Sequence, residues 1–182
     1  ALLRNSERLN TIVSSMLDLA HLESGTFELF LSMFEIKPLI EKSIEIFQET
    51  EIEHSYTITM EVEEGLKAYV DVQAFSHIIH NYVENAIKYT SRKGTIRVIG
   101  KQTADGIKVS VSDNGPGIDS KYSGRVFERF FRVDKGRSRK EGGTGLGLSI
   151  VRNMADAMGA QVGMNDSDLG GAEFWCLFPN RS

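Results

Sequence analysis

The sequence has one cysteine, three prolines and no long hydrophobic run. The lone Cys176 excludes an internal disulfide, and no cluster of cysteine and histidine offers a zinc site. No apolar stretch approaches the roughly 20 residues needed to cross a bilayer, and no signal peptide opens the chain. The net charge of −4 argues against a large nucleic-acid-binding surface. These absences favour a globular protein in a reducing, cytoplasmic setting.

What remains is the composition of an ordinary globular chain, with 182 residues, 41% of them hydrophobic and 25% charged. A helical pattern is already running at Ala1, so we expect a piece of a longer protein. Leu9, Ile12, Met16 and Leu19 recur at alternating three- and four-residue steps. This spacing predicts a first helix with a narrow apolar seam that needs a partner helix.

Strand and helix periods alternate through the rest of the chain. Their order predicts an α+β fold, a two-layer α/β sandwich in which helices cover one face of a mixed, largely antiparallel sheet. One long helix precedes this sandwich. The predicted strands lie near 27–33, 56–62, 68–70, 96–98, 107–111, 161–164 and 173–178, and the later helices begin near Pro38, Val72 and Leu146.

The helix predicted from about Val72 to Tyr89 carries a polar stripe as well as an apolar one. Asn81, Asn85 and Lys88 follow at steps of four and three residues, which places them on one face. Carboxamide oxygens ligate Mg²⁺ without adding negative charge beside a triphosphate, and an ammonium group neutralises phosphate. The stripe therefore fits a magnesium–phosphate site, and taken alone it also fits a solvated helix face.

A glycine-rich turn, Asp113-Asn114-Gly115-Pro116-Gly117-Ile118, follows an apolar strand directly. A carboxylate fixed at a strand end can accept a hydrogen bond from the exocyclic amine of adenine, and it would repel the oxygen that guanine carries there. Gly115 and Gly117 permit a sharp turn and a close approach to a flat base. The pattern indicates an adenine site, with an ordinary Asn-Gly turn as the alternative.

A second glycine-rich segment, Gly142-Gly143-Thr144-Gly145-Leu146-Gly147-Leu148, opens the last helix. Its backbone N–H groups and the helix dipole favour phosphate. The spacing matches neither a dinucleotide fingerprint nor a Walker A motif, and a plain glycine-rich helix cap is the alternative.

A long polar stretch, residues 116–143, separates the strand-end aspartate from these glycines and includes Phe127-Glu128-Arg129-Phe130-Phe131-Arg132. Loops of this length inside a compact domain are usually functional or disordered. We expect a mobile lid that its three phenylalanines hold in place, with Arg132 reaching the γ-phosphate. A partly disordered basic loop is the alternative for residues 135–140.

The order of these features is more specific than any one of them. In this order, the four features resemble the N, G1, F and G2 boxes of the ATP-binding domain of bacterial sensor histidine kinases. The features are the amide stripe at residues 81–88, the aspartate and glycine turn at 113–118, the aromatic and basic lid, and the glycine-rich segment at 142–148. That family belongs with the DNA gyrase, mismatch-repair and heat-shock chaperone ATPases. The resemblance covers the chain from Phe27 onward and depends most on Asn81-Tyr-Val-Glu-Asn85-Ala-Ile-Lys88-Tyr89-Thr90 and Gly143-Thr-Gly-Leu-Gly-Leu148.

The resemblance implies a role for each motif residue in a site for ATP and Mg²⁺. Asn85 would hold the metal, Tyr89 would flank the nucleotide and Asp113 would read the adenine. Asn81, Lys88 and Arg132 would act in catalysis. The implied nucleotide site comprises Asn81, Asn85, Lys88, Tyr89, Asp113, Gly115, Gly117, Ile118, Arg132, Gly143, Thr144, Gly145, Leu146 and Gly147.

The resemblance also implies a division of the chain. Residues 1–25 resemble the second helix of the family's dimerisation hairpin, and residues 26–182 its catalytic domain with a lid over about 116–143. The family's phosphoacceptor histidine lies on the hairpin's other helix and is absent, and His21 lacks the sequence that surrounds it. The implied activity is a protein-histidine kinase that transfers the ATP γ-phosphate to a histidine outside this chain, then onward to a response-regulator receiver domain. The full-length protein would be a homodimer.

Three other functions share this type of ATP site. An ATP-hydrolysing clamp needs a glutamate base near Asn81, where this chain has an amide, although Glu84 is close by. A serine kinase of the anti-sigma type conflicts with the dimer-like seam of the first helix. A binding module that has lost catalysis conflicts with the intact set of motif residues.

Overall fold

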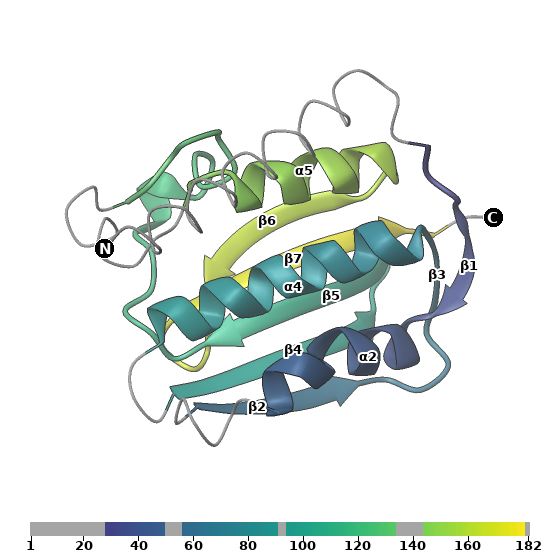
Figure 1. The fold of residues 1–182 in the computed structure, drawn as a ribbon, viewed down its shortest axis with the longest axis horizontal. Helices are drawn as coiled ribbons and strands as arrows, with labels where there is room; N and C mark the ends of the chain where they lie inside the picture. The colour runs from purple at the N-terminus through teal and green to yellow at the C-terminus, as the bar shows by residue number, and fades with distance from the viewer. Residues whose placement is uncertain (1–27, 50–55, 91–93, 134–143, 181–182) are drawn as a thin grey trace, which may run out of the picture.

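The computed structural model describes residues 28–49, 56–90, 94–133 and 144–180, so the helix expected over residues 1–25 lies outside the described residues. A five-stranded sheet runs in the order β2-β4-β5-β7-β6, and a separate two-stranded sheet joins β1 to β3 (Figure 1). In the larger sheet β2 and β4 are parallel and the other neighbours are antiparallel. The elements are β1 Ser32–Glu35, α2 Ile36–Glu49, β2 Tyr56–Val62, β3 Lys67–Val70, α4 Val72–Tyr89, β4 Gly94–Gln102, β5 Gly106–Asp113, the 3₁₀ turn η1 Ser120–Tyr122, α5 Gly147–Ala157, β6 Gln161–Asp166 and β7 Ala172–Pro179.

Helices α2, α4 and α5 lie side by side over one face of the larger sheet (Figure 1). The core between the two layers is continuous and is built from the inward residues of β4, β5 and β7 and the apolar stripes of the three helices. This is the two-layer α+β arrangement that the sequence predicts, and the mixed, largely antiparallel sheet is confirmed. No helix within the described residues is long and apolar enough to cross a membrane.

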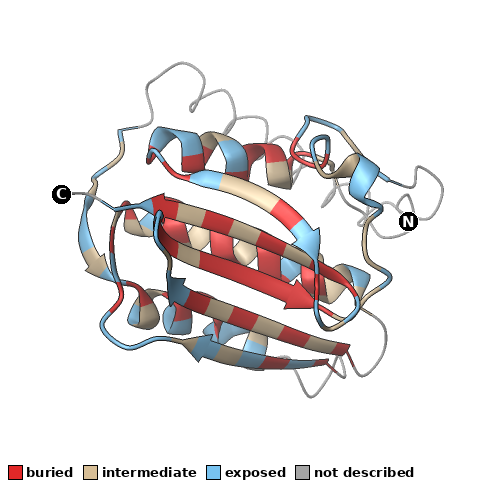
Figure 2. Ribbon diagram, turned by 180° about the vertical axis from the view of Figure 1, so that it is seen from behind, coloured by how far each residue is buried: buried red, intermediate tan, exposed pale blue. Residues whose placement is uncertain are grey.

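The other face of the sheet is not covered by a helix among the described residues (Figure 2). Buried and half-buried residues alternate along β4 and β7, as expected when only one face is packed. The outer face carries polar and amphipathic side chains, including the Lys108–Glu173 ion pair at 2.6 Å. The ring of Trp175 contacts Gly163 of the neighbouring strand β6, where any side chain would collide with the ring.

Helix α4 is central because it spans the core and bears the polar stripe. Its amino end is capped by Asp71, whose carboxylate accepts from the backbone N–H groups of Gln73 and Ala74 at 2.9 Å. Its bounds, Val72–Tyr89, agree with the prediction. The face toward the sheet is buried over Ala74, Phe75, Ile78, Ile79, Tyr82, Val83 and Ala86.

The structure corrects two boundaries near the start of the described chain. The strand predicted over 27–33 is found at Ser32–Glu35, because pairing with β3 begins at Ser32. Leu29 and Leu31 still pack against the core without belonging to a strand. Helix α2 begins at Ile36, two residues before Pro38. The backbone N–H of Ile36 donates to the carbonyl of Leu66 at 2.9 Å. Pro38 is tolerated in the first turn because the N–H that it lacks has no partner within the helix there.

Candidate functional site

The centre of the candidate site is Asp113, the last residue of β5, with 5% of its surface exposed. Its Oδ1 accepts from the backbone N–H of Gly115 at 2.8 Å and from that of Ala172 at 3.3 Å. Burial raises the pKa of the Asp113 carboxyl above its usual value, and the two N–H donors partly oppose that rise. The side chain is thus a rigidly held acceptor at a strand end, as the sequence predicts for it.

Gly171 is part of this arrangement and was missed by sequence reasoning. Its N–H donates to the carbonyl of Asp113 at 3.1 Å, and a Cβ on Gly171 would overlap both Asp113 Oδ1 and the backbone N of Gly115. Only glycine can therefore occupy position 171 without displacing the carboxylate. The signal in the sequence is a Gly-Gly pair, and its link to Asp113 depends on the β5–β7 pairing, which the sequence does not reveal.

The turn after Asp113 packs on the carboxyl end of α4. A Cβ on Gly115 would lie 2.8 Å from both Asp113 Oδ1 and the carbonyl oxygen of Tyr89, so the close approach requires glycine. Gly117 has a φ of +70°, a conformation that glycine adopts without strain. Ile118 is half-buried against the core, and Tyr89 is 44% exposed beside the turn.

Asn114 fixes this junction and is a second residue that the sequence did not single out for a role. Its Oδ1 accepts from the backbone N–H of Thr95 at 2.9 Å and from the hydroxyl of Thr90 at 3.2 Å. One amide oxygen therefore joins the end of α4, the start of β4 and the turn after β5. These two bonds join the turn after Asp113 to the end of α4, the helix that carries the amide stripe.

The polar stripe of α4 contacts the start of α5 through Asn81. Asn81, Asn85 and Lys88 are all half-buried, whereas Glu84 on the same helix is exposed. The Asn81 side chain donates from Nδ2 to the carbonyl of His77 at 3.3 Å, and its Oδ1 occupies the space that a Cβ on Gly147 would need. The first amide of the stripe and the first residue of α5 are therefore in direct contact.

The glycine-rich segment turns sharply as it enters α5. Gly145 has a φ of +72°, and the N–H of Leu146 is held by the hydroxyl of Thr144 at 3.2 Å. Leu146 is fully buried and packs into the core at the start of α5. Gly143 lies outside the described residues.

The lid region is described as far as residue 133 and is anchored differently from our expectation. Phe127 is buried, and its ring centroid lies 6.2 Å from that of Phe174. Phe130, by contrast, is 58% exposed, so the expectation that its side chain anchors the lid is wrong. The backbone N–H of Phe130 instead donates to the carbonyl of Gly145 at 2.8 Å, and its φ is +61°.

This backbone bond brings the end of the lid to the glycine segment. Phe131 completes the anchor, because its ring lies 5.7 Å from that of Tyr122 and 4.6 Å from the guanidinium of Arg125. Arg132 follows at once and is half-buried. The structure therefore makes two groups of contacts along α4. The turn at 114–118 packs on the end of the helix, and the start of α5, joined to the lid end, meets Asn81.

The donor groups at the site suit a magnesium ion shared with phosphates. Among the described residues there is no group of three or more His, Cys, Asp or Glu side chains that could hold a metal. The half-buried carboxamide of Asn85 is a neutral, hard oxygen donor on the stripe. Such a donor set fits Mg²⁺ that takes its remaining ligands from phosphate and water.

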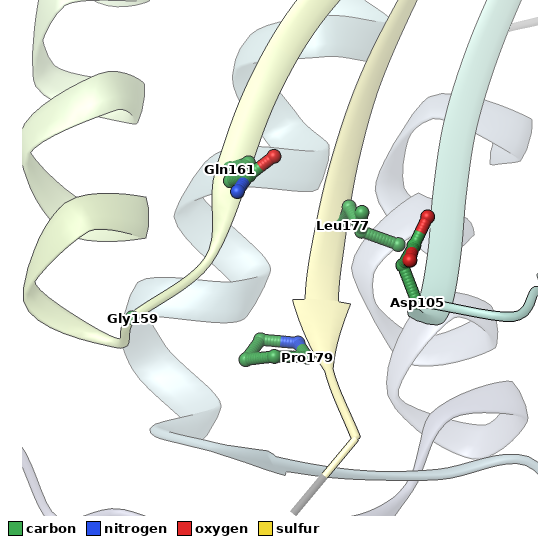
Figure 3. Close-up of a pocket in the computed structure, with 5 residues that line it drawn as sticks. All are labelled: Asp105, Gly159, Gln161, Leu177 and Pro179. Carbon is green, nitrogen blue, oxygen red and sulfur yellow. The ribbon is translucent and has the colours of Figure 1, made fainter.

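A separate hollow of about 330 Å³ (Figure 3) lies at the end of β5 that is opposite to Asp113. Asp105 precedes β5, whereas Asp113 ends it, so the length of the strand separates the hollow from the candidate site. We assign this hollow no part in nucleotide binding. It is lined by Asp105, Gly159, Gln161, Leu177 and Pro179.

Together, the fold and the site define an ATP-binding domain in which one sheet face is covered by helices and a strand-end carboxylate faces a glycine turn. The family model for the histidine kinase-, DNA gyrase B- and HSP90-like ATPases matches residues 70–182. The chain belongs to this family.

Curated relatives and solved structures narrow the likeness to sensor histidine kinases. The chain is 33% identical to the hybrid signal transduction histidine kinase D of Dictyostelium discoideum over 97% of its length and 12% of that protein. It is 31% identical to the sensor protein RstB of Escherichia coli over 99% of its length and 42% of that protein. The chain thus spans less than half the length of either relative.

Two solved structures of histidine kinases have the same fold as this chain. Full-length ShkA in complex with AMPPNP aligns with a TM-score of 0.81 at 29% identity, covering 100% of this chain and 38% of that one. The catalytic domain of the histidine kinase ThkA in a nucleotide-free form aligns with a TM-score of 0.71 at 25% identity, covering 83% and 97%.

Proposed function

We propose that this chain is the ATP-binding catalytic part of a two-component sensor histidine kinase. It transfers the γ-phosphate of ATP to a histidine on a dimerisation hairpin, and from there the phosphate passes to a response-regulator receiver domain. The observation that carries the proposal is the buried Asp113 carboxylate, held by backbone N–H groups at the end of β5, where the turn at 114–118 packs on the end of α4. The proposal places the domain in the cytoplasm, where ATP is supplied.

Each part of the site has a distinct task in this proposal. Asp113 accepts from the exocyclic amine of adenine, while Gly115 and Gly117 let the backbone approach the base. The N–H groups at the start of α5 receive phosphate oxygens, with the helix dipole adding to the attraction. Asn85 would hold Mg²⁺, which when bound neutralises charge on the phosphates.

The protein's share in the transfer is positioning and charge neutralisation, because phosphoryl transfer needs little covalent help. Lys88 and Arg132 supply positive charge along the phosphate tail. Asn81, in contact with Gly147, aligns the stripe with the start of α5. The attacking nitrogen belongs to an imidazole outside this chain, and homodimerisation of the full-length protein would present it.

A hydrolysing clamp on the same fold needs a base to activate water. The residue that meets the start of α5 is the amide of Asn81, which cannot accept a proton as a base does. Glu84 is exposed, whereas the amides of the stripe are half-buried. The geometry therefore favours transfer to an external acceptor over hydrolysis.

Incubation of the chain with a histidine-bearing hairpin from a sensor kinase and γ-labelled ATP tests this function. We expect acid-labile label on the hairpin, little free phosphate, and transfer reduced by Arg132→Ala. Rapid steady-state release of phosphate without hairpin labelling would contradict the proposal and indicate the clamp.

A further inference from the structure

Residues 28–31, the incoming segment, precede β1 and lie near the amino end of α4. Leu29 and Leu31 pack against the core, while the side chain of Phe30 between them is 77% exposed. Strand β1 then pairs with β3, with Ser32 opposite Val70. The next residue after β3 is Asp71, so the incoming segment and the start of α4 lie side by side (Figure 1).

The two oxygens of Asp71 serve different partners. Oδ1 accepts from the N–H groups of Gln73 and Ala74 at 2.9 Å, which is the helix cap. Oδ2 accepts from the backbone N–H of Phe30, also at 2.9 Å and 41 residues away in sequence. A cap needs one oxygen, so the second bond is not required to begin the helix.

The bond to Phe30 is well placed to restrain the incoming segment. Asp71 is only 7% exposed, and a carboxylate that accepts from an N–H forms one of the stronger kinds of hydrogen bond. The exposed side chain of Phe30 adds little packing, so its backbone N–H is the group that fixes this residue. The restrained partner is the helix that carries Asn81, Asn85 and Lys88.

We infer that Asp71 is a positioning residue: by joining Phe30 to α4, it makes the nucleotide-binding helix and the incoming segment move as one body. The inference rests on the proposed function, in which the phosphoacceptor hairpin precedes this domain in the chain. A fixed junction limits the orientations in which the bound γ-phosphate can meet that hairpin. Loosening it lowers the effective concentration of the reacting groups without altering the nucleotide site.

The substitution Asp71→Asn separates the two bonds. The amide orientation that keeps both cap hydrogen bonds places an NH₂ group against the N–H of Phe30, where two donors face each other. In the complete kinase, including its hairpin, we expect kcat for histidine phosphorylation to fall about tenfold, which corresponds to about 1.4 kcal/mol. KM for ATP should stay within about twofold, because one hydrogen bond remote from the site is lost.

Phe30→Pro removes the donor and leaves the cap of α4 intact, so it should reproduce the loss even if Asp71→Asn folds poorly. Phe30→Ala is the matched control, because it keeps the N–H and should retain kcat. Hydrogen exchange should show the Phe30 amide losing protection in Asp71→Asn while the Gln73 and Ala74 amides keep theirs.

Unchanged kcat in both Asp71→Asn and Phe30→Pro would overturn the inference. So would a rise in KM for ATP as large as the fall in kcat, since that would indicate damage to the nucleotide site. A wild-type kinase that binds no ATP or labels no histidine would instead contradict the proposed function itself.

Discussion

Replacing Asp113 by asparagine changes the chemistry of the adenine site while leaving its shape intact. Oδ1 already accepts from the N–H groups of Gly115 and Ala172, so the amide oxygen must take that place. The other position then carries an NH₂ group, a donor that faces the donating amine of adenine. Losing a hydrogen bond to a charged group costs about 1.5–3 kcal/mol. The Kd for ATP should therefore rise about 10- to 150-fold.

Folding should be spared, because burial disfavours the ionised carboxylate that is removed. We expect calorimetry to show the weaker ATP binding and a smaller preference over GTP, whose ring oxygen can accept from the new NH₂ group. Thermal unfolding should change little. Asp166→Asn, at the exposed end of β6, is the matched control and should bind ATP normally. An unchanged Kd and an unchanged ATP-over-GTP preference in Asp113→Asn would refute the assigned role.

Three further predictions concern the same site. Asn85→Ala should lose the Mg²⁺-dependent part of ATP binding, so that calorimetry with and without Mg²⁺ gives the same weak affinity; normal affinity would count against the metal assignment. Gly147→Ala should displace the Asn81 amide and weaken ATP binding at little cost in the free energy of urea unfolding, because only the end of one side chain must move; Gly124→Ala, which has open space, is the matched control and should bind ATP normally. If Gly147→Ala binds ATP normally, the contact with Asn81 is unimportant. Because burial raises the pKa of Asp113, this carboxyl stabilises the free protein most below its ordinary pKa, and that contribution is lost as pH rises through the raised value. Urea unfolding should therefore show the free energy of unfolding of wild type falling relative to that of Asp113→Asn as pH rises above the ordinary pKa of an aspartate, and the opposite trend would contradict the shift.

Local patterns were enough to predict most of the fold. The helix predicted from about Val72 to Tyr89 has those bounds in the structure, and the turn predicted at Ala104-Asp105-Gly106 joins β4 to β5. The incoming strand was misplaced because Leu29 and Leu31 alternate like strand residues and are half-buried like them. Their pairing partner begins only at Ser32, and pairing is a property of two segments that one segment cannot reveal.

The residues of the candidate site likewise fall into those that local sequence patterns predict and those that depend on distant contacts. Asp113 and the stripe of α4 were predicted because their chemistry is encoded in neighbouring residues. Gly171 and Asn114 were missed because each acts through a contact with a distant strand or helix. Phe130 was misjudged because an aromatic residue in a lid suggests packing, whereas here the backbone makes the contact.

The central claim is that one site along α4, from the turn after β5 to the start of α5, binds ATP with Mg²⁺. Titration calorimetry of this chain with ATP in excess Mg²⁺ tests it most directly. We predict saturable binding of one ATP per chain that weakens sharply in Asp113→Asn and in Asn85→Ala. No heat of binding at millimolar ATP, from a chain shown by circular dichroism to be folded, would contradict it.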